Sequence, residues 1–214
     1  MRYLILLFIL SLCLNSQAQI PFVKEKRDYI WLLGYDSNPD NLIFGGTRID
    51  YNTLPPQISY EFRDLEFDIT NASICDTAGN LLFYTNGIEI HNAANELMEN
   101  GDGLNPDPYT DVWADRGYNL CQGTLILPIP ENNDLYYLIH TERTTFPEWL
   151  NGDFYIVHKM YLTKVDFSED TLGVVLSKNE VLVSDTLDYG KTTAARHANG
   201  RDWWILQQEY FSNR

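Results

Sequence analysis

The chain has 214 residues, with 15 basic side chains against 30 acidic ones and a formal charge of −15. Charged residues are only 21% of the sequence and aromatic residues are 14%, which excludes a disordered acidic tail. The length is sufficient to bury a sizeable core. The acidic balance argues against nucleic acid as a partner and against docking on anionic lipid, because both carry negative charge.

The first 18 residues have the pattern of a secretory signal peptide. Arg2 is the only charge among the first 23 residues, and the apolar run 4–14 is too short to span a bilayer. Small residues precede a predicted cleavage after Ala18. We therefore expect an exported protein whose mature part is residues 19–214, with no transmembrane segment after the leader. An uncleaved anchor, or a lipoprotein attached through Cys13, is the alternative.

Cys75 and Cys121 are the two cysteines of the predicted mature part. In an exported protein they can pair, but two cysteines do not make a disulfide framework. Each is flanked by residues typical of strands, so buried free thiols are an equal alternative.

Beyond residue 25, short apolar runs alternate with polar clusters that are typical of turns, which predicts antiparallel sheet. A single segment, 93–98, predicts a short turn of helix. The apolar runs expected to form strands are 29–33, 42–44, 81–84, 88–90, 125–127, 135–140, 155–162, 174–176, 181–183 and 203–207. The turn clusters are 37–40, 78–80, 131–134 and 199–202.

A polar turn followed by a bulky apolar strand recurs four times. The first apolar residues of the four copies are Leu42, Leu81, Leu135 and Trp203, at unequal spacing. A propeller blade holds four strands in about 40–45 residues, with insertions at loops. The repeat therefore predicts an all-β fold, a partial β-propeller of about three and a half four-stranded antiparallel blades. A β-sandwich, whose hairpins also look alike, is the alternative.

Two strings, Arg196–Trp204 and Asp76–Gly87, carry a resemblance to a known group. From about residue 27 onwards the chain resembles the N-terminal β-propeller region of exported Bacteroidetes proteins that end in a type IX secretion sorting domain. The resemblance implies a secreted or cell-surface protein, or a periplasmic one without the sorting domain, and it brings no catalytic residues. Relatives continue into further blades beyond the position of residue 214, so we expect a truncated propeller.

The last strands of such a truncated propeller have no following blade. We expect the segment Trp203–Phe211 to expose an unpaired edge and apolar faces, and the isolated chain to be aggregation-prone or only partly folded.

Two turns stand out as structural motifs. In the first, Asp76, Gly79 and Asn80 form a hairpin turn, where Gly79 and Asn80 are expected to take the positive φ that a tight hairpin needs. The second comprises the residues of the Arg196–Trp204 string that shape a turn, namely His197, Gly200, Asp202 and Trp203. We expect His197 to hold this turn through hydrogen bonds to the backbone near Asn199.

The adjacent residues Trp203 and Trp204 must face opposite sides of their strand. We expect at least one of them to pack in the core. The role of the other tryptophan is left undecided, and its ring can stack on a sugar if it is exposed.

No metal site is predicted. The four histidines, His91, His140, His158 and His197, form no short-range ligand pair of the kind that zinc sites show. The Asp- and Asn-rich loop Asn100–Asp115 is expected to be a solvated surface loop, with calcium binding as the alternative.

Three Asp-Thr-apolar triplets place Thr77, Thr171 and Thr186 in the O-glycosylation pattern that the resemblance implies for exported Bacteroidetes proteins. Asp-Thr is also ordinary turn chemistry, which is the alternative.

The sequence contains no phosphate-binding glycine loop, nucleophile elbow or paired His-Glu zinc motif. It therefore predicts a non-enzymatic binding or display scaffold, without a cofactor, whose partner is a protein or a glycan. One alternative is a carbohydrate-active propeller enzyme with two carboxylates about 5–10 Å apart. Another is a non-functional truncated gene product. The identity of the ligand and the oligomeric state stay open.

Overall fold

The computed structural model describes residues 25–34, 45–145 and 155–213, and these fold into antiparallel sheets with one short helix. The all-β prediction is confirmed. The predicted signal peptide with Ala18, the run 42–44 and the turn 37–40 lie outside the described residues. No helix of the described ranges has the length and apolar character needed to cross a bilayer.

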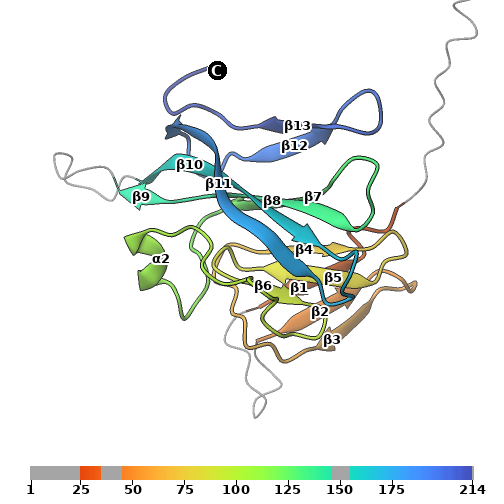
Figure 1. Cartoon of the computed structure of the whole chain (residues 1–214). Helices are drawn as coiled ribbons and strands as arrows, with labels where there is room; N and C mark the ends of the chain where they lie inside the picture. Colours follow the sequence, from red (N-terminus) through yellow and green to blue (C-terminus); the bar gives the residue numbers. More distant parts are fainter. Residues whose placement is uncertain (1–24, 35–44, 146–154, 214) are drawn as a thin grey trace, which may run out of the picture.

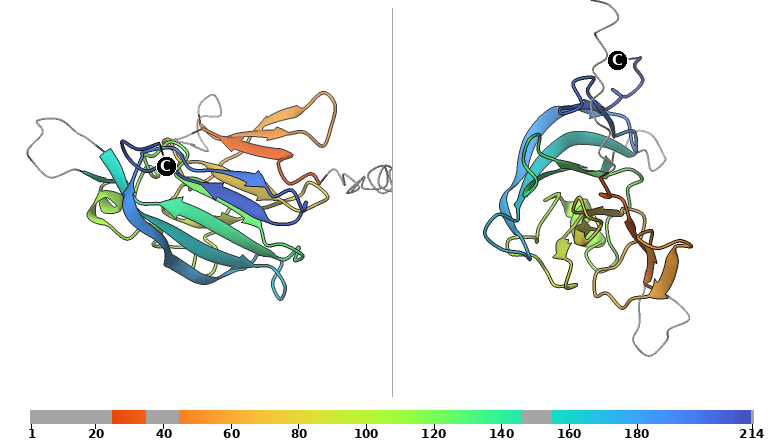
Figure 2. Two further views of the ribbon diagram at one scale, coloured as in Figure 1. Left: turned by 90° about the horizontal axis from the view of Figure 1, so that it is seen from above. Right: turned by 90° about the vertical axis from the view of Figure 1, so that its right-hand side faces the viewer.

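The sheets follow one another along the chain and lie in successive layers in Figures 1 and 2. The first contains β1 (Ile30–Leu33), β2 (Thr47–Asp50) and β3 (Gln57–Tyr60). The second contains β4 (Ala72–Cys75), β5 (Leu81–Thr85) and β6 (Ile90–Asn92). The third contains β7 (Thr124–Pro128), β8 (Leu135–Thr141), β9 (Thr144–Thr145), β10 (Tyr155–Asp166) and β11 (Val174–Leu187). The fourth contains β12 (Thr193–Arg196) and β13 (Trp203–Leu206).

The sequence repeat marks one recurring position in these sheets. Leu81, Leu135 and Trp203 begin β5, β8 and β13, and each of these strands pairs with the strand before it. The sheets nevertheless differ in size, from two to five strands, and they do not close into a ring. The similar turns therefore reflect a shared hairpin, while the predicted four-stranded blades are not established by the described residues.

Three local predictions are wrong. The strand expected at 88–90 begins only at Ile90 and runs to Asn92 as β6. The runs 174–176 and 181–183 belong to one long strand, β11, in which Asn179 takes a left-handed φ of 57° and the pairing with β10 shifts register. The helix forms at α2 (Pro108–Val112), where Asp107 caps the first turn, and not at 93–98. There the Asn92 side chain accepts backbone N–H groups and holds a turn.

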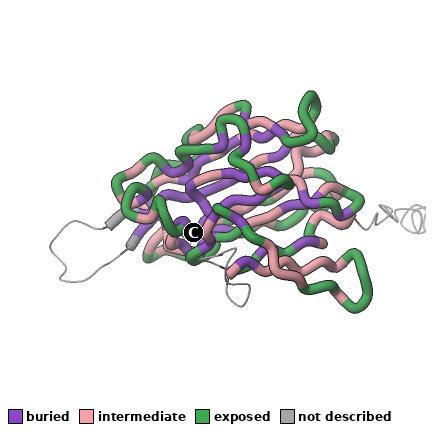
Figure 3. The backbone as a smooth tube through the Cα atoms, turned by 90° about the horizontal axis from the view of Figure 1, so that it is seen from below, coloured by how far each residue is buried: buried purple, intermediate pink, exposed green. Residues whose placement is uncertain are grey.

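The main core lies between the second and third sheets. Phe83 on β5 and Tyr136 on β8 are fully buried, with ring centroids 5.8 Å apart in an edge-to-face arrangement. Figure 3 shows buried backbone along the strands and exposed backbone at the turns. Cys75 is buried and Cys121 is exposed, and the two do not pair. Burial raises the pKa of Cys75 to about 11.

A buried polar network crosses this core at His140 on β8. Its Nδ1 lies 2.8 Å from Asn105 Oδ1, and its Nε2 lies 2.9 Å from Thr163 Oγ1. Because the Asn105 amide nitrogen donates to the Gly87 carbonyl, its oxygen must accept, so Nδ1 of His140 carries the proton. The Thr163 hydroxyl then donates to Nε2 and accepts from the backbone N–H of Asn179. The network is satisfied only with a neutral imidazole.

Strand β13 is an edge. Among the described residues it pairs only with β12. Its residues Trp204, Ile205 and Leu206 are exposed, and so is Phe211 beyond it. The expected exposed apolar edge is therefore present over β13 but not over the whole of 203–211, because the backbone of Gln208 and Tyr210 bonds with that of the segment 186–188. The aggregation of the chain stays a prediction.

We expect the stability of the fold to fall in acid because of His140. Burial lowers its pKa to about 3 in the folded state, whereas an unfolded histidine titrates near 6.5. Between these values the unfolded state binds the extra proton, so stability is lost as the pH falls below about 6.5, by up to about 1.4 kcal/mol per pH unit. The free energy of unfolding, measured with urea from pH 4 to 7, should depend less steeply on pH in His140→Gln than in the parent chain. His158→Gln, at an exposed position, should keep the pH dependence of the parent chain. An equal pH dependence in His140→Gln and His158→Gln would contradict the role of His140.

We expect a charge on the exposed edge to suppress self-association. Leu206→Lys places a lysine on β13, where it disfavours pairing with another strand. Light scattering during storage at 37 °C should show slower aggregation than in the parent chain. Val112→Lys adds the same charge on α2 and serves as the control. Equally slow aggregation of this control would mean that net charge, and not the β13 edge, determines the aggregation rate.

Candidate functional site

The first predicted motif is the turn between β4 and β5. Oδ1 of Asp76 accepts the backbone N–H groups of Ala78 and Asn80 at 2.8 and 2.9 Å, and its Oδ2 accepts the Asn80 amide at 2.8 Å. Gly79 has the expected positive φ, 95°, but Asn80 does not. Asn80 contributes its hydrogen bonds to Asp76 instead. Burial raises the pKa of Asp76, but the hydrogen bonds from Asn80, Ala78 and Gly79 outweigh it and hold this pKa below its ordinary value.

The second predicted motif is the turn between β12 and β13. Oδ1 of Asn199 accepts the backbone N–H groups of Arg201 and Asp202, both at 3.0 Å, and its amide donates to the Asp202 carboxylate at 2.6 Å. The backbone N–H of Asn199 donates to His197 Nδ1 at 3.2 Å. Gly200 has a φ of 72°. Hydrogen bonds from Arg201 and Asn199 hold the pKa of Asp202 below its ordinary value.

Asn199 is the central residue of this turn, although the sequence prediction did not include it among the motif residues. The available signal was the Asn-Gly dipeptide at 199–200, which is typical of tight turns.

The two tryptophans face opposite sides of the β12–β13 hairpin. The Trp203 indole donates to the Pro128 carbonyl at 3.1 Å and packs against the buried cluster of the third sheet. The Arg196 guanidinium lies over its ring, 4.9 Å from the centroid. Trp204 is 60% exposed, and the His197 ring lies 5.3 Å from it. One ring is therefore anchored and the other is open to solvent.

A cleft of about 280 Å³ lies beneath the hairpin, between the segment 25–27, the β7–β8 turn and β12–β13. We call it the arginine cleft. The residues that define it are Glu25, Arg27, Glu131, Arg196, Arg201 and Trp203. The structure thus brings Gly200 and Trp203 of the second motif to a cavity, whereas the first motif lies at a separate turn.

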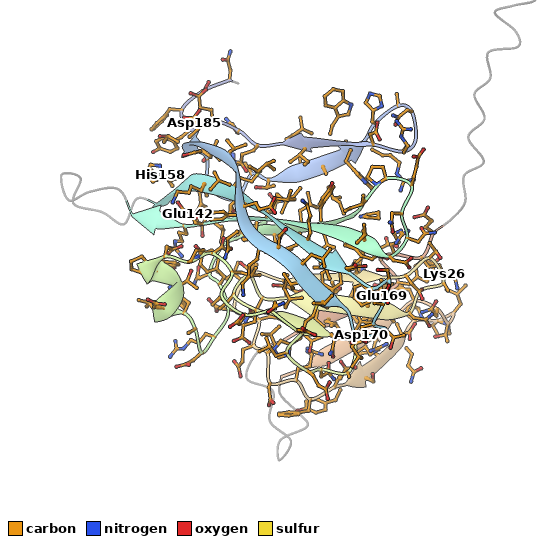
Figure 4. All side chains as sticks on the ribbon, in the orientation of Figure 1. Lys26, Glu142, His158, Glu169, Asp170 and Asp185 are labelled. Carbon is orange, nitrogen blue, oxygen red and sulfur yellow. The ribbon has the colours of Figure 1, made fainter. Side chains whose placement is uncertain are left out.

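A second cavity, of about 440 Å³, lies at the other end of the third sheet. A β-bulge places Asp185 and Thr186 opposite His158, because Val157 pairs with Leu187 but Lys159 pairs with Ser184. Figure 4 shows Glu142, His158 and Asp185 at this same end.

Glu142 is the buried carboxylate of this second cavity. Tyr161 donates to it at 2.7 Å, and Lys159 Nζ lies 3.6 Å from it. Burial, together with the hydrogen bond to Glu142 and the charge of this residue, raises the pKa of Tyr161. Glu142 and Asp185 thus line one cavity, and Glu142 is already engaged by two neighbours.

The loop Asn100–Asp115 uses its carboxylates within the protein. Asp102 forms an ion pair with Lys178 at 2.7 Å, which lowers the pKa of Asp102. Asp107 caps α2 by accepting backbone N–H groups of its first turn. Within the described ranges, no three His, Cys, Asp or Glu side chains gather as metal ligands require.

The three candidate glycosylation residues lie apart. Thr77 is exposed in the β4–β5 turn and Thr171 is exposed between β10 and β11. Thr186 lines the second cavity, and its backbone N–H donates to Asp185. They do not form one modified surface.

Comparison of the chain with protein-family models, with curated proteins and with solved structures finds no match.

We expect Asp76→Ala to destabilise the fold by about 1–3 kcal/mol at pH 7, because it leaves three donors of the β4–β5 turn without this acceptor. The contribution of Asp76 is fully present above the unfolded pKa of about 3.9 and is lost as the pH falls through the lower folded pKa. The free energies of unfolding of variant and parent, measured with urea, should therefore approach each other as the pH falls through the lowered pKa of folded Asp76. Asp115→Ala, in an exposed position, serves as the control. A difference that persists at low pH would show that the carboxylate charge is not involved.

Proposed function

We propose that the chain is an exported, non-enzymatic binding module that recognises a glycan through the β12–β13 hairpin. The observation that supports this most directly is the exposed Trp204 ring on a hairpin whose turn is held in one conformation by Asn199. A large aromatic side chain that is ordered before binding pays little conformational entropy when a ligand contacts it.

The chemistry around Trp204 suits a sugar. An aromatic ring offers an apolar face, and sugar rings present apolar C–H groups on one side and hydroxyl groups at their edges. His197 extends the aromatic surface, and the polar groups of Asn199, Arg201 and Asp202 lie in the adjoining turn. Binding sites typically combine an apolar surface with a few positioned polar groups.

We propose further that the scaffold is part of a β-propeller. The sheets are successive antiparallel meanders, as blades are, and neighbouring sheets contact through their first strands, β1 with β4 and β4 with β7. A rigid stack of this kind presents loops and hairpins to a partner.

The proposed location outside the inner membrane is supported by the signal-peptide pattern of residues 1–18 and by the resemblance to exported Bacteroidetes proteins. A surface glycan is a partner within reach of an exported module.

We expect Trp204→Ala to weaken glycan binding at least about tenfold, equivalent to about 1.4 kcal/mol, because it removes the stacking surface. Affinity electrophoresis against a panel of soluble polysaccharides measures this loss. Trp31→Ala is the matched control, since Trp31 is also half exposed and lies on Tyr51 in the first sheet. Equal binding by Trp204→Ala and the parent would contradict the proposed site. Glycan hydrolysis that is lost in Glu142→Gln would contradict a non-enzymatic role.

A further inference from the structure

The arginine cleft gathers positive charge in an acidic protein. Arg27 from the segment before β1 meets Arg196 and Arg201 of the β12–β13 hairpin there, in a chain of formal charge −15. Two carboxylates, those of Glu25 and Glu131, line it as well. Arg27 and Arg201 each have a carboxylate within 3.1 Å, whereas Arg196 has its carboxylate partner only at 4.0 Å. A guanidinium without a close counter-charge in a concave site favours an anionic ligand.

The three arginines differ in how firmly the protein holds them. The Arg27 side chain is held in place, since it donates to Glu25 at 2.6 Å and to Tyr136 and Asn133 at 3.0 Å each. Its side chain is only 13% exposed. Arg27 therefore forms part of the wall of the cleft, and its hydrogen-bond donors are used within the protein.

Arg196 is positioned but loosely engaged. The Trp203 ring supports its guanidinium from one face, and the side chain is 47% exposed. Its ion pair with Glu25 has an N–O distance of 4.0 Å, well beyond the roughly 2.7–2.9 Å of a charge-assisted hydrogen bond. A guanidinium that lies over an aromatic ring keeps its planar fork of N–H donors, which a carboxylate can match with two hydrogen bonds.

Arg201 lies at the turn end of the same cleft. It pairs with Glu131 at 3.1 Å and with Asp202 at 3.0 Å, and it is half exposed. It supplies a second positive charge at the rim, while Glu131 offers an acceptor beside it.

We propose that the arginine cleft binds the carboxylate of a uronic acid residue in an acidic glycan, with Arg196 as the principal contact. This inference rests on the proposed glycan-binding function and adds the class of the ligand. The volume of about 280 Å³ lies at the lower end of ligand sites, which fits a single sugar residue.

The mixed lining of the cleft favours a uronic acid over an acidic peptide. The carboxylates of Glu25 and Glu131 have further lone pairs and can accept hydrogen bonds from hydroxyl groups, which a uronic acid carries on the same small ring as its carboxylate. A glutamate-rich peptide has carboxylates but no such hydroxyl groups.

Isothermal titration calorimetry with polygalacturonate, and with its fully methyl-esterified form, tests the proposal on the full chain. We expect binding to polygalacturonate and little binding to the ester. Arg196→Ala should weaken binding at least tenfold. Arg196→Lys should also weaken it several-fold, because lysine lacks the planar fork. Arg116→Ala removes an exposed arginine elsewhere and should bind as the parent does.

The outcomes separate the two proposals, because Trp204 and the arginine cleft lie on opposite faces of the hairpin. Equal binding of acid and ester, or unchanged binding by Arg196→Ala with an unchanged melting temperature, overturns the uronate proposal. If the uronate proposal fails but Trp204→Ala loses glycan binding, the proposed glycan-binding function stands without the uronate site. Loss in Arg196→Ala but not in Trp204→Ala supports the cleft and overturns the Trp204 site. Equal affinity for poly-glutamate overturns the saccharide assignment in favour of an acidic peptide.

Discussion

The hydrogen bonds of buried His140 are the constraint on which the rest of the structure depends. They connect β8 with β10 through Thr163 and with the loop that contains Asn105, and Asn105 in turn reaches Gly87 after β5. A buried polar group without a partner costs as much as a lost hydrogen bond or more, so each of these groups tolerates one arrangement. The network thereby fixes how the second and third sheets lie against each other.

The β12–β13 hairpin depends on that arrangement. Trp203 packs on the cluster that includes Leu127 and Ile139, and its indole reaches the backbone of Pro128 at the end of β7. Trp203 is thus one attachment of the hairpin to the third sheet. The Arg201–Glu131 ion pair and the backbone hydrogen bonds of Gln208 and Tyr210 at the end of β11 are others. This anchoring orients the turn, and the exposed Trp204 ring and the arginine cleft follow on its two faces. Local turn chemistry at Asn199 and long-range packing at Trp203 serve the same end, which is a site that is ordered before a ligand arrives.

The sequence was informative wherever the determining interactions are local. Runs such as 135–140 and turns such as 199–202 carry their own signals, because apolar alternation and Asn-Gly chemistry act over a few residues. It failed where tertiary contacts decide. Nothing local distinguishes one long β11 from two short strands, since Asn179 is tolerated there only because it bonds with partners on β10 and in the loop after Gly101.

The candidate site shows the same division. The motif residues His197, Gly200 and Asp202 could be selected from a single string. The arginine cleft could not, because Arg27 and Arg196 are distant in the sequence and meet through the fold. Asn199 lies between these cases, since its dipeptide predicts a turn but not the four hydrogen bonds that it makes there.

The central claim is that the ligand site is the β12–β13 hairpin with the cleft beneath it. Its most direct test is a titration of the isotopically labelled full chain with galacturonate oligosaccharides, followed by two-dimensional NMR of the backbone amides, the indole N–H groups and the arginine side chains. We expect perturbations at Arg196, at Arg201 and at the indole N–H groups of Trp203 and Trp204, with the residues outside the hairpin and the cleft unchanged. Perturbations centred on His158 and Asp185 in the second cavity, or none at saturating ligand, would contradict the account.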